Sequence, residues 1–234
     1  MTQPLTFPYL IVGSGRAATH FKNYLALKGI PYCDWNRKEH KEAEFQKCLA
    51  RASTVLLLIK DSAIEEFRDQ NLAQFKGAVV HFSGSLSVEG IESFHPLMTF
   101  GPELYDLGFY EKIFFACSFG KRFRELFPKL VNPVFEIKKE DRAFYHALCV
   151  MSGNFPQILR HDCLSEFNKL GVPSGAVALY WQKNFENFMA NPDQSLTGPL
   201  VRGDEKTIQR NIEALPQRLK ALYVAFVEFY KSRE

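Results

Sequence analysis

The sequence predicts an α/β protein in which a doubly wound parallel sheet is followed by an all-helical C-terminal domain. Two observations carry this prediction. Short apolar runs alternate with helical patterns up to about residue 137, an alternation typical of βαβ units. Beyond that point helical spacing continues without further strand signals. We therefore expect the domain boundary near residues 132–138, and assign residues 1–135 and 136–234 to the two domains.

The strands expected in the first domain are short and apolar. They lie at residues 8–12, 31–35, 54–59, 78–82, 113–117 and 133–137. The third run is apolar almost throughout, which is typical of a parallel strand covered on both faces. Helices are expected at residues 16–28, at residues 39–51 and after Asp61, whose carboxylate can cap a helix start.

The second domain is expected to consist of helices. They are predicted at residues 139–170 with interruptions at Gly153 and Pro156, at 174–189, from Asp204 to about 215, and from Pro216 to 230. Aromatic residues recur along the later helices at helical spacing, which favours a core or a subunit interface over a cofactor site. We therefore expect a homodimer formed through the C-terminal helices.

Composition and charge exclude several classes of protein. The 234 residues include 29 basic and 26 acidic side chains, and a net charge of +3 without a basic run gives no argument for nucleic acid. The longest apolar run, residues 55–59, is far shorter than the ~20 residues of a membrane helix, and no signal-peptide pattern is visible. Five cysteines without a C-x-x-C pair indicate reduced thiols. A soluble cytoplasmic protein without membrane or nucleic-acid partners is expected.

A glycine-rich turn separates the first predicted strand from the first predicted helix. Gly13-x-Gly15-x-x-Ala18 fits a dinucleotide-binding loop: the first glycine permits a tight turn, the second lets the backbone approach a pyrophosphate, and the alanine allows close packing. The N-terminus of the helix offers unpaired N–H groups to phosphate. The residues assigned to the cofactor here are Gly13, Ser14, Gly15, Arg16 and Ala17.

The end of the second predicted strand should contact the adenosine ribose. If Asn36 occupies that position, its neutral amide tolerates a 2′-phosphate and Arg37 can pair with the phosphate, which favours NADP over NAD. In the alternative, Asp34 is the ribose ligand and Arg37 is a solvated loop residue.

Several stretches make the chain resemble the 6-phosphogluconate dehydrogenase-type superfamily, and more narrowly the Rossmann-like proteins with a C-terminal domain of unknown function 2520. They are Asn36-Arg37, His81–Ser85, His95–Phe100, residues 145–154 and Thr197–Asp204. The resemblance implies a Rossmann domain before a helical domain. Some members of the group are thought to act as ketopantoate reductases, in which a lysine and an asparagine of the corresponding helix contact the substrate.

The resemblance places His146 and Asn154 on that helix, with histidine in place of lysine. Eight residues span slightly over two helical turns, so both side chains can face one cleft. His146 is expected to donate a proton and Asn154 to hold the substrate oxygen. A helix histidine bonded to a backbone carbonyl is the alternative.

Four further positions are candidates for substrate binding. Ser83 and Gly84 follow the fourth predicted strand, at the edge where ligands bind in open α/β sheets, and His95 can add another imidazole over the cleft. Each is equally compatible with a structural turn. Arg202 can clamp a carboxylate bidentately, or bridge to Asp204.

The histidines show no metal-binding spacing and no G-x-S-x-G elbow is present, so a zinc enzyme or a hydrolase of that type is not expected. The sequence as a whole predicts an NADP-dependent oxidoreductase that reduces a small carboxylate-bearing ketone or imine of the ketopantoate type. The alternative is a non-catalytic NADP-binding sensor, which the replacement of lysine by His146 favours.

Overall fold

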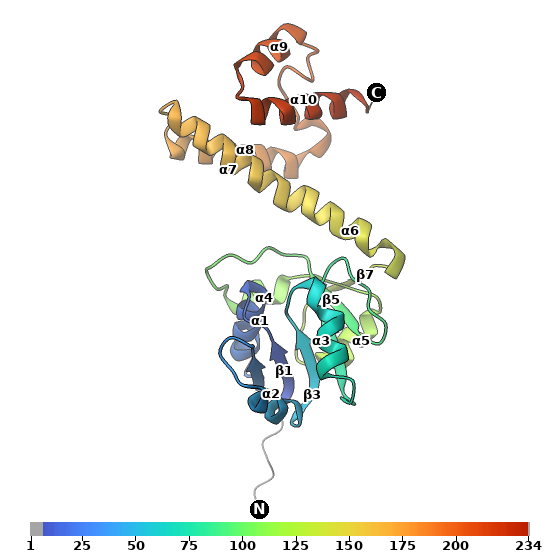
Figure 1. The fold of residues 1–234 in the computed structure, drawn as a ribbon. Coiled ribbons are helices and arrows are strands. Elements are labelled where there is room, and N and C mark those ends of the chain that lie inside the picture. Colours follow the sequence, from blue (N-terminus) through green and yellow to red (C-terminus); the bar gives the residue numbers. More distant parts are fainter. Residues whose placement is uncertain (1–6, 234) are drawn as a thin grey trace, which may run out of the picture. The chain divides into compact units, whose positions relative to one another are not determined.

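The computed structural model describes residues 7–233 and divides the chain into two compact units, Met1–Ile158 and Leu159–Glu234 (Figure 1). The units are described separately below as unit 1 and unit 2. They meet within a helix, whereas the sequence pattern puts the boundary near residues 132–138. The ranges 1–135 and 136–234 mark where strands give way to helices in the sequence, and as domain boundaries they stay a prediction.

Unit 1 contains the predicted doubly wound sheet. Its strands are β1 (Phe7–Val12), β2 (Tyr32–Trp35), β3 (Ala52–Leu57), β4 (Ala78–His81), β5 (Glu92–Pro96), β6 (Phe115–Cys117) and β7 (Val134–Glu136). The spatial order is β2-β1-β3-β4-β5-β6-β7, and β5 and β6 form the antiparallel pair of an otherwise parallel sheet. Because the chain passes from β2 back across β1 to β3, the order of strands switches direction at the end of β1.

The helices of unit 1 cover both faces of the sheet and are short. They are α1 (Arg16–Leu27), α2 (Glu42–Leu49), α3 (Ile64–Asn71), α4 (Leu107–Lys112), α5 (Gly120–Leu126) and α6 (Arg142–Cys149). Alternate residues of the central strands enter two separate cores, with Ile11 and Leu56 in one and Leu10 and Val55 in the other. This alternation explains why these strands are apolar almost throughout.

Three elements of unit 1 were not predicted. Strand β5 has the sequence Glu-Ser-Phe-His-Pro, which contains no apolar run, and it lies in the sheet because β4 and β6 pair with its two edges. Helices α4 and α5 span six and seven residues, too few for a helical period to stand out in sequence.

The helix that follows β7 changes its winding near the end of unit 1. After α6 the chain forms a π-helical segment, Val150–Asn154, and then α7 (Phe155–Lys169). Pro156 has no N–H to donate, and in an α-helix its ring would meet the carbonyl of Ser152, four residues earlier. A wider turn avoids this contact, which accounts for the π-helical segment.

Unit 2 is helical, as predicted. Besides the remainder of α7 it contains α8 (Ser174–Ala190), α9 (Glu205–Ala214) and α10 (Gln217–Lys231). The predicted cap is confirmed, since the Asp204 carboxylate accepts a hydrogen bond from the backbone N–H of Thr207. Among its described residues, the buried apolar side chains are Val177, Ile208 and Val227.

The prediction of five reduced thiols was wrong for one pair. Cys33 of β2 and Cys48 of α2 form a disulfide with their Cα atoms 6.0 Å apart. The two residues are 15 positions apart in sequence, and the packing of α2 against β2 brings them together. Cys117, Cys149 and Cys163 are free thiols. Within the described residues, no helix is long and apolar enough to cross a membrane.

Candidate functional site

The glycine-rich turn lies at the switch point of the sheet, directly after β1. Gly13 has a φ of 138° and donates its N–H to the carbonyl of Trp35 over 3.0 Å. A Cβ at Gly13 would collide with the backbone carbonyl of Leu58. Glycine is therefore required here twice, by the backbone conformation and by the close approach of the segment that follows β3.

The N-terminus of α1 is open at this turn. Gly15 is the N-cap residue in an extended conformation, no side chain caps the helix, and no acidic residue lies in the first turn. Nothing lies within 4 Å of a Cβ built at Gly15, whereas Ala18 is fully buried against the sheet. Ser14 and Arg16 are exposed and Ala17 is half-buried. Free N–H groups at a helix N-terminus with open space before them can hold a phosphate group.

The loop after β2 is held by its own side chains. Asn36 is buried; its side chain donates to the Glu39 carboxylate over 2.9 Å and accepts from the Lys38 backbone N–H over 3.2 Å. Asn36 therefore shapes the loop. Arg37 and Lys38 are exposed, and neither side chain has a partner among the described residues. Both are free to bind an anion.

Asp34, the alternative ribose ligand, lies inside β2. The ammonium group of Lys22 on α1 is 3.1 Å from its carboxylate. Strand β2 ends at Trp35, so Asn36 and Arg37 stand where the sequence analysis placed them.

A second group of candidate residues gathers around Gly84, in the turn after β4. A Cβ at Gly84 would lie 2.5 Å from Cδ2 of His146 and 3.0 Å from Cδ2 of His95. The two imidazole rings pack edge to face, with centroids 5.7 Å apart. The structure thus brings together three predicted residues from β5, α6 and the turn after β4. Glycine at position 84 allows this approach.

Tyr145 belongs to this group and was missed by the sequence analysis. Its hydroxyl lies 2.9 Å from Nδ1 of His95, and its ring packs edge to face on the same imidazole. Burial, followed by the neighbouring Cys149 thiol, raises the pKa of Tyr145. The signal available in sequence was adjacency to His146, but neighbouring helix positions point in different directions, so adjacency alone gave no reason to choose it.

Arg142 supplies the charge beneath this group. Its guanidinium is fully buried and donates to the Ser93 hydroxyl over 2.6 Å and to the Ser93 carbonyl over 3.3 Å. Among the described residues, no carboxylate pairs with it. Burial and the Arg142 charge lower the pKa of His81 to about 4, and burial, His146 and Arg142 lower the pKa of His95 to about 4. Both imidazoles are therefore neutral at pH 7.

Ser83 is committed to a structural contact. Its hydroxyl donates to the Asp61 carboxylate over 2.6 Å, and its oxygen accepts from the backbone N–H groups of Ser85 and Leu86. Asp61 starts a short 3₁₀ turn (Asp61–Ala63) and fixes the turn after β4 rather than capping a helix with its side chain.

Asn154 and Arg202 are both exposed. Asn154 ends the π-helical segment, eight residues after His146. In a regular α-helix eight residues advance by about 80° beyond two turns, and the wider π-turn reduces this offset. Arg202 belongs to unit 2, and among the described residues no ion pair joins it to Asp204, whose carboxylate bonds Thr207 instead.

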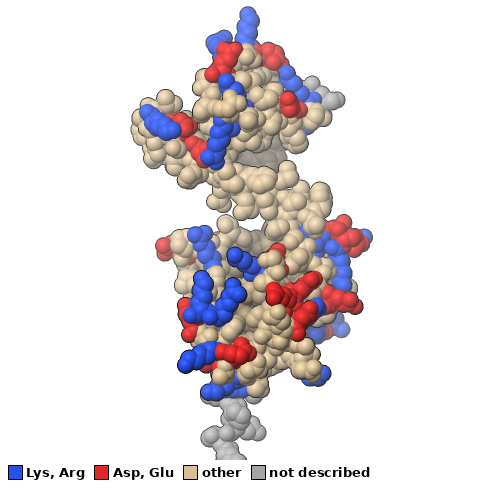
Figure 2. Space-filling view, viewed as in Figure 1, with Lys and Arg blue, Asp and Glu red and all other residues tan. Residues whose placement is uncertain are grey.

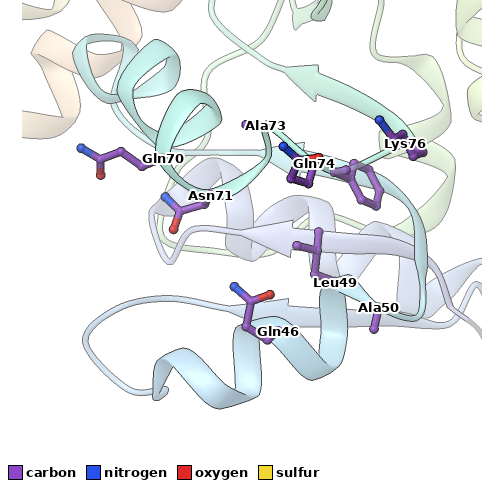
Figure 3. Close-up of a pocket in the computed structure, with 9 residues that line it drawn as sticks. Gln46, Leu49, Ala50, Gln70, Asn71, Ala73, Gln74 and Lys76 are labelled. Carbon is purple, nitrogen blue, oxygen red and sulfur yellow. The ribbon is translucent and has the colours of Figure 1, made fainter.

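A pocket of about 420 Å³ lies at the opposite edge of the sheet (Figure 3). Its walls come from the C-terminal ends of α2 and α3, which lead into the first residues of β3 and β4. Side-chain amides line much of it, including Gln46, Gln70 and Gln74 (Figure 3). None of the predicted site residues lines this pocket. Among the described residues, no group of three or more His, Cys, Asp or Glu side chains could hold a metal ion.

Comparison with known proteins supports the predicted family and fold. Residues 120–228 match the family model described as domain of unknown function DUF2520. The predicted resemblance to the DUF2520 proteins is confirmed for these residues. The DUF2520 region covers just under half of the chain and includes α6, α7 and the Thr197–Asp204 stretch. No curated protein matches the sequence.

Solved structures share the whole fold. A "putative NADP oxidoreductase" from Bacteroides fragilis is 21% identical with a TM-score of 0.77, covering 96% of this chain and 98% of its own. A Thermotoga maritima protein is 20% identical, with a TM-score of 0.68 and coverage of 96% and 97%. The 1-pyrroline-5-carboxylate reductase of Streptococcus pyogenes is 14% identical, with a TM-score of 0.56 and coverage of 96% and 98%. The predicted Rossmann sheet followed by a helical domain is therefore confirmed.

Proposed function

We propose that the protein is an NADP-dependent oxidoreductase that reduces a small carboxylate-bearing ketone or imine. The observation that carries this proposal is the uncapped N-terminus of α1 at the switch point of the sheet, with open space at Gly15 and the free cations of Arg37 and Lys38 nearby in the fold. The N–H groups of α1 bind the pyrophosphate and the guanidinium of Arg37 binds the 2′-phosphate. The bound nicotinamide supplies the hydride.

The residues around Gly84 are suited to the other half of the reaction. His146 donates the proton that the substrate oxygen or nitrogen needs as its carbon is reduced, and Asn154 holds the substrate through its amide. Ser83 and Gly84 form the turn on which the imidazoles of His95 and His146 rest. Arg202 is exposed, and its guanidinium can bind a carboxylate.

The names of solved structures of the same fold support reduction of a C=N bond. Besides the pyrroline carboxylate reductase they include an imine reductase from Myxococcus stipitatus and a reductive aminase from Aspergillus terreus. A non-catalytic NADP-binding sensor would need the N-terminus of α1 and Arg37, but not the histidines around Gly84. Measuring turnover therefore distinguishes an oxidoreductase from a sensor.

Two glycine substitutions test cofactor binding with a built-in control. Gly15 has an ordinary φ of −74° and open space at Cβ, so Gly15→Ala is expected to leave the melting temperature of the free protein unchanged while weakening NADPH binding. Gly13→Ala is expected to lower the melting temperature itself, because its φ is positive and Leu58 leaves no room. Isothermal titration with NADPH and NADH gives the affinities. Unchanged NADPH affinity in Gly15→Ala would contradict the proposal.

Turnover is then measured as loss of NADPH absorbance with ketopantoate and with 1-pyrroline-5-carboxylate. Reduction of either supports an oxidoreductase. Tight NADPH binding without turnover of a wider panel of keto acids and cyclic imines would favour the sensor.

We also propose that the protein is a homodimer assembled through its C-terminal helices. Three buried apolar side chains among the described residues are too few to form a core for unit 2. Large apolar residues are instead exposed on α8 and α10, among them Leu179, Tyr180, Phe185, Phe188, Met189, Phe226 and Phe229. In Figure 2 the helical stretch directly beyond the sheet is mostly free of charged side chains, whereas Lys, Arg, Asp and Glu side chains are scattered over α9 and α10. A second copy covering these faces by two-fold symmetry would supply the missing core.

Sedimentation at micromolar concentration is expected to give a dimer. Phe226→Glu, on the exposed face of α10, is expected to dissociate it, whereas Lys220→Glu on the same helix should not. A monomeric wild-type protein would end this proposal. A cytoplasmic location is also proposed, from the cofactor.

A further inference from the structure

Four histidines of unit 1 have their Nδ1 atom engaged in a hydrogen bond. Nδ1 of His40 accepts from the backbone N–H of Asn36 over 3.2 Å, in the loop after β2. Nδ1 of His20 lies 2.9 Å from the hydroxyl of Tyr110, and Nδ1 of His95 lies 2.9 Å from the hydroxyl of Tyr145. Nδ1 of His81 accepts from the backbone N–H of Ser83 over 3.2 Å. In a neutral imidazole, one nitrogen donates and the other accepts. The partner at Nδ1 therefore decides what Nε2 can do.

His20 shows a histidine–tyrosine pair whose tautomer is fixed by the partner at Nε2. Its Nε2 lies 2.9 Å from the carbonyl oxygen of Gly101, which can only accept a hydrogen bond. Nε2 of a neutral His20 therefore carries the hydrogen, and Nδ1 accepts from the hydroxyl of Tyr110. The His20–Tyr110 pair can therefore be compared with the His95–Tyr145 pair in the same unit.

His95 also has a tyrosine hydroxyl at Nδ1. Burial raises the pKa of Tyr145, so its hydroxyl keeps its proton and can donate it to Nδ1. His95 is neutral at pH 7, because burial, His146 and the charge of Arg142 outweigh the nearby Asp61 carboxylate and lower the pKa of His95 to about 4. With the Tyr145 hydroxyl as donor to Nδ1, Nε2 of a neutral His95 carries the hydrogen, and this is the tautomer that we adopt.

The two histidines differ in what faces Nε2. Among the described residues, the buried side-chain nitrogens or oxygens without a partner are Nε2 of His81 and Nε of Arg142. Nε2 of His95 also has no hydrogen-bond partner among the described residues. It is not one of these buried atoms, so it is accessible to solvent. His20 meets a carbonyl of its own chain at this position, whereas His95 presents an unused N–H beside Gly84 and His146.

We propose that the Nε2–H of His95 donates a hydrogen bond to the substrate's carbonyl oxygen or imine nitrogen, and that Tyr145 is the positioning residue that fixes this tautomer. This inference rests on the proposed function. As hydride adds to the substrate carbon, the electron pair of the C=O or C=N bond moves to the oxygen or nitrogen, which takes its proton from His146. His95 stabilises the developing charge and keeps its own proton.

A neutral donor suits this position. An imidazolium would lose its proton to the substrate and compete with His146, whereas a neutral imidazole can only donate a hydrogen bond. The buried charge of Arg142 helps to keep His95 neutral without touching the substrate. The two histidines around Gly84 thus have separate roles, one binding the reacting atom and one supplying the proton.

The tautomer is tested by ring ¹⁵N NMR of the ¹⁵N-histidine-labelled full-length protein at pH 7. The wild-type protein is expected to show His20 and His95 both in the Nε2–H form. In Tyr145→Phe, the His95 signals should move toward a mixture of tautomers while those of His20 stay unchanged. Tyr180→Phe, the same chemical change on exposed α8, should alter neither. An Nδ1–H form of His95 in the wild type, or an unaltered tautomer in Tyr145→Phe, would overturn the assignment.

The donor role is tested by turnover with ketopantoate and 1-pyrroline-5-carboxylate. His95→Leu, which has no donor, should lower kcat by roughly 10²–10³-fold, the scale of losing one oriented donor. His95→Gln, whose amide can reach the same position, should recover at least ~10-fold of that loss, and Tyr145→Phe should cost about 2–10-fold. NADPH affinity should stay unchanged in all three. Equal kcat in His95→Leu and the wild type would overturn the donor role.

Failure of the proposed function and failure of the donor role of His95 give different results. If NADPH binds but neither these two compounds nor the wider panel of keto acids and cyclic imines is reduced, the proposed function and the donor role both fall, while the NMR result still decides the pairing of Tyr145 with His95. If turnover is found and His95→Gln is as slow as His95→Leu, the proposed function stands and the donor role falls.

Discussion

His81 and His95 are expected to make the stability of the protein depend on pH between 7 and 5. Both are neutral in the folded protein, with pKa values lowered from 6.5 to about 4. Between these values the unfolded chain binds protons that the folded chain does not bind, so the free energy of unfolding falls as the pH falls. At and above pH 7 this contribution is nearly fully present.

The magnitude follows from the difference between the pKa of 6.5 for a histidine of the unfolded chain and the pKa of about 4 for the folded protein. For a fully buried histidine such as His81, lowering the pH from 7 to 5 should remove about 2 kcal/mol, because a tenfold difference in proton affinity corresponds to ~1.4 kcal/mol. His95 is half-buried and should add a smaller loss. Glu186 and Asp204 do not interfere, because their pKa values lie below their ordinary values and both stay ionised at pH 5.

Urea unfolding followed by circular dichroism at pH 7 and pH 5 measures this difference. His81→Gln cannot titrate at this position, so the loss between the two pH values should shrink by about 2 kcal/mol in this variant. Gln182→His, which adds a histidine on exposed α8, serves as a control and should leave the difference nearly unchanged. If wild type and His81→Gln lose the same free energy between pH 7 and pH 5, the reasoning from burial and Arg142 is refuted.

Three other substitutions and one thiol titration test separate parts of the structure. Arg37→Ala should weaken NADPH binding by ~1–3 kcal/mol, the value of a charge-assisted bond, and leave NADH binding nearly unchanged in calorimetry; equal losses would refute the 2′-phosphate assignment. Gly84→Ala should lower the free energy of unfolding by about 1–3 kcal/mol and slow turnover, because its methyl group displaces the imidazole of His146; full activity would contradict the packing. His146→Gln should cut kcat by roughly 10²–10⁴-fold with unchanged NADPH affinity, and a wild-type rate would exclude this proton donor. Thiol titration of the denatured, non-reduced protein should find the three free cysteines and rise to five after reduction, whereas five at the outset would exclude the Cys33–Cys48 disulfide.

Elements with a strong local pattern could be predicted. The apolar runs of β1 and β3 and the glycine-rich turn between β1 and α1 have signals that do not depend on distant residues. Strand β5 had no such signal, since its membership in the sheet comes from pairing with β4 and β6. The Cys33–Cys48 pair likewise depends on how α2 packs against β2.

The candidate site likewise has one part with a local sequence signal and one part that depends on contacts between distant residues. The phosphate-binding half lies within one stretch of chain, from β1 through the loop after β2, so Gly13, Gly15 and Arg37 could be chosen from spacing alone. The half around Gly84 joins β4, β5 and α6, and its decisive contact links residues 50 positions apart, His95 and Tyr145.

The sequence by itself determined the fold class and the position of the glycine-rich turn, because hydrophobic periodicity and backbone conformation act between near neighbours. Only the tertiary structure decided which histidines are neutral and which nitrogen of His95 is free. Those properties follow from the burial of Arg142 and from the hydroxyl of Tyr145, which reach His95 through packing between distant segments. Electrostatic effects in a protein interior depend on distance in space and on exclusion of water, and a sequence pattern specifies neither for segments far apart in the chain.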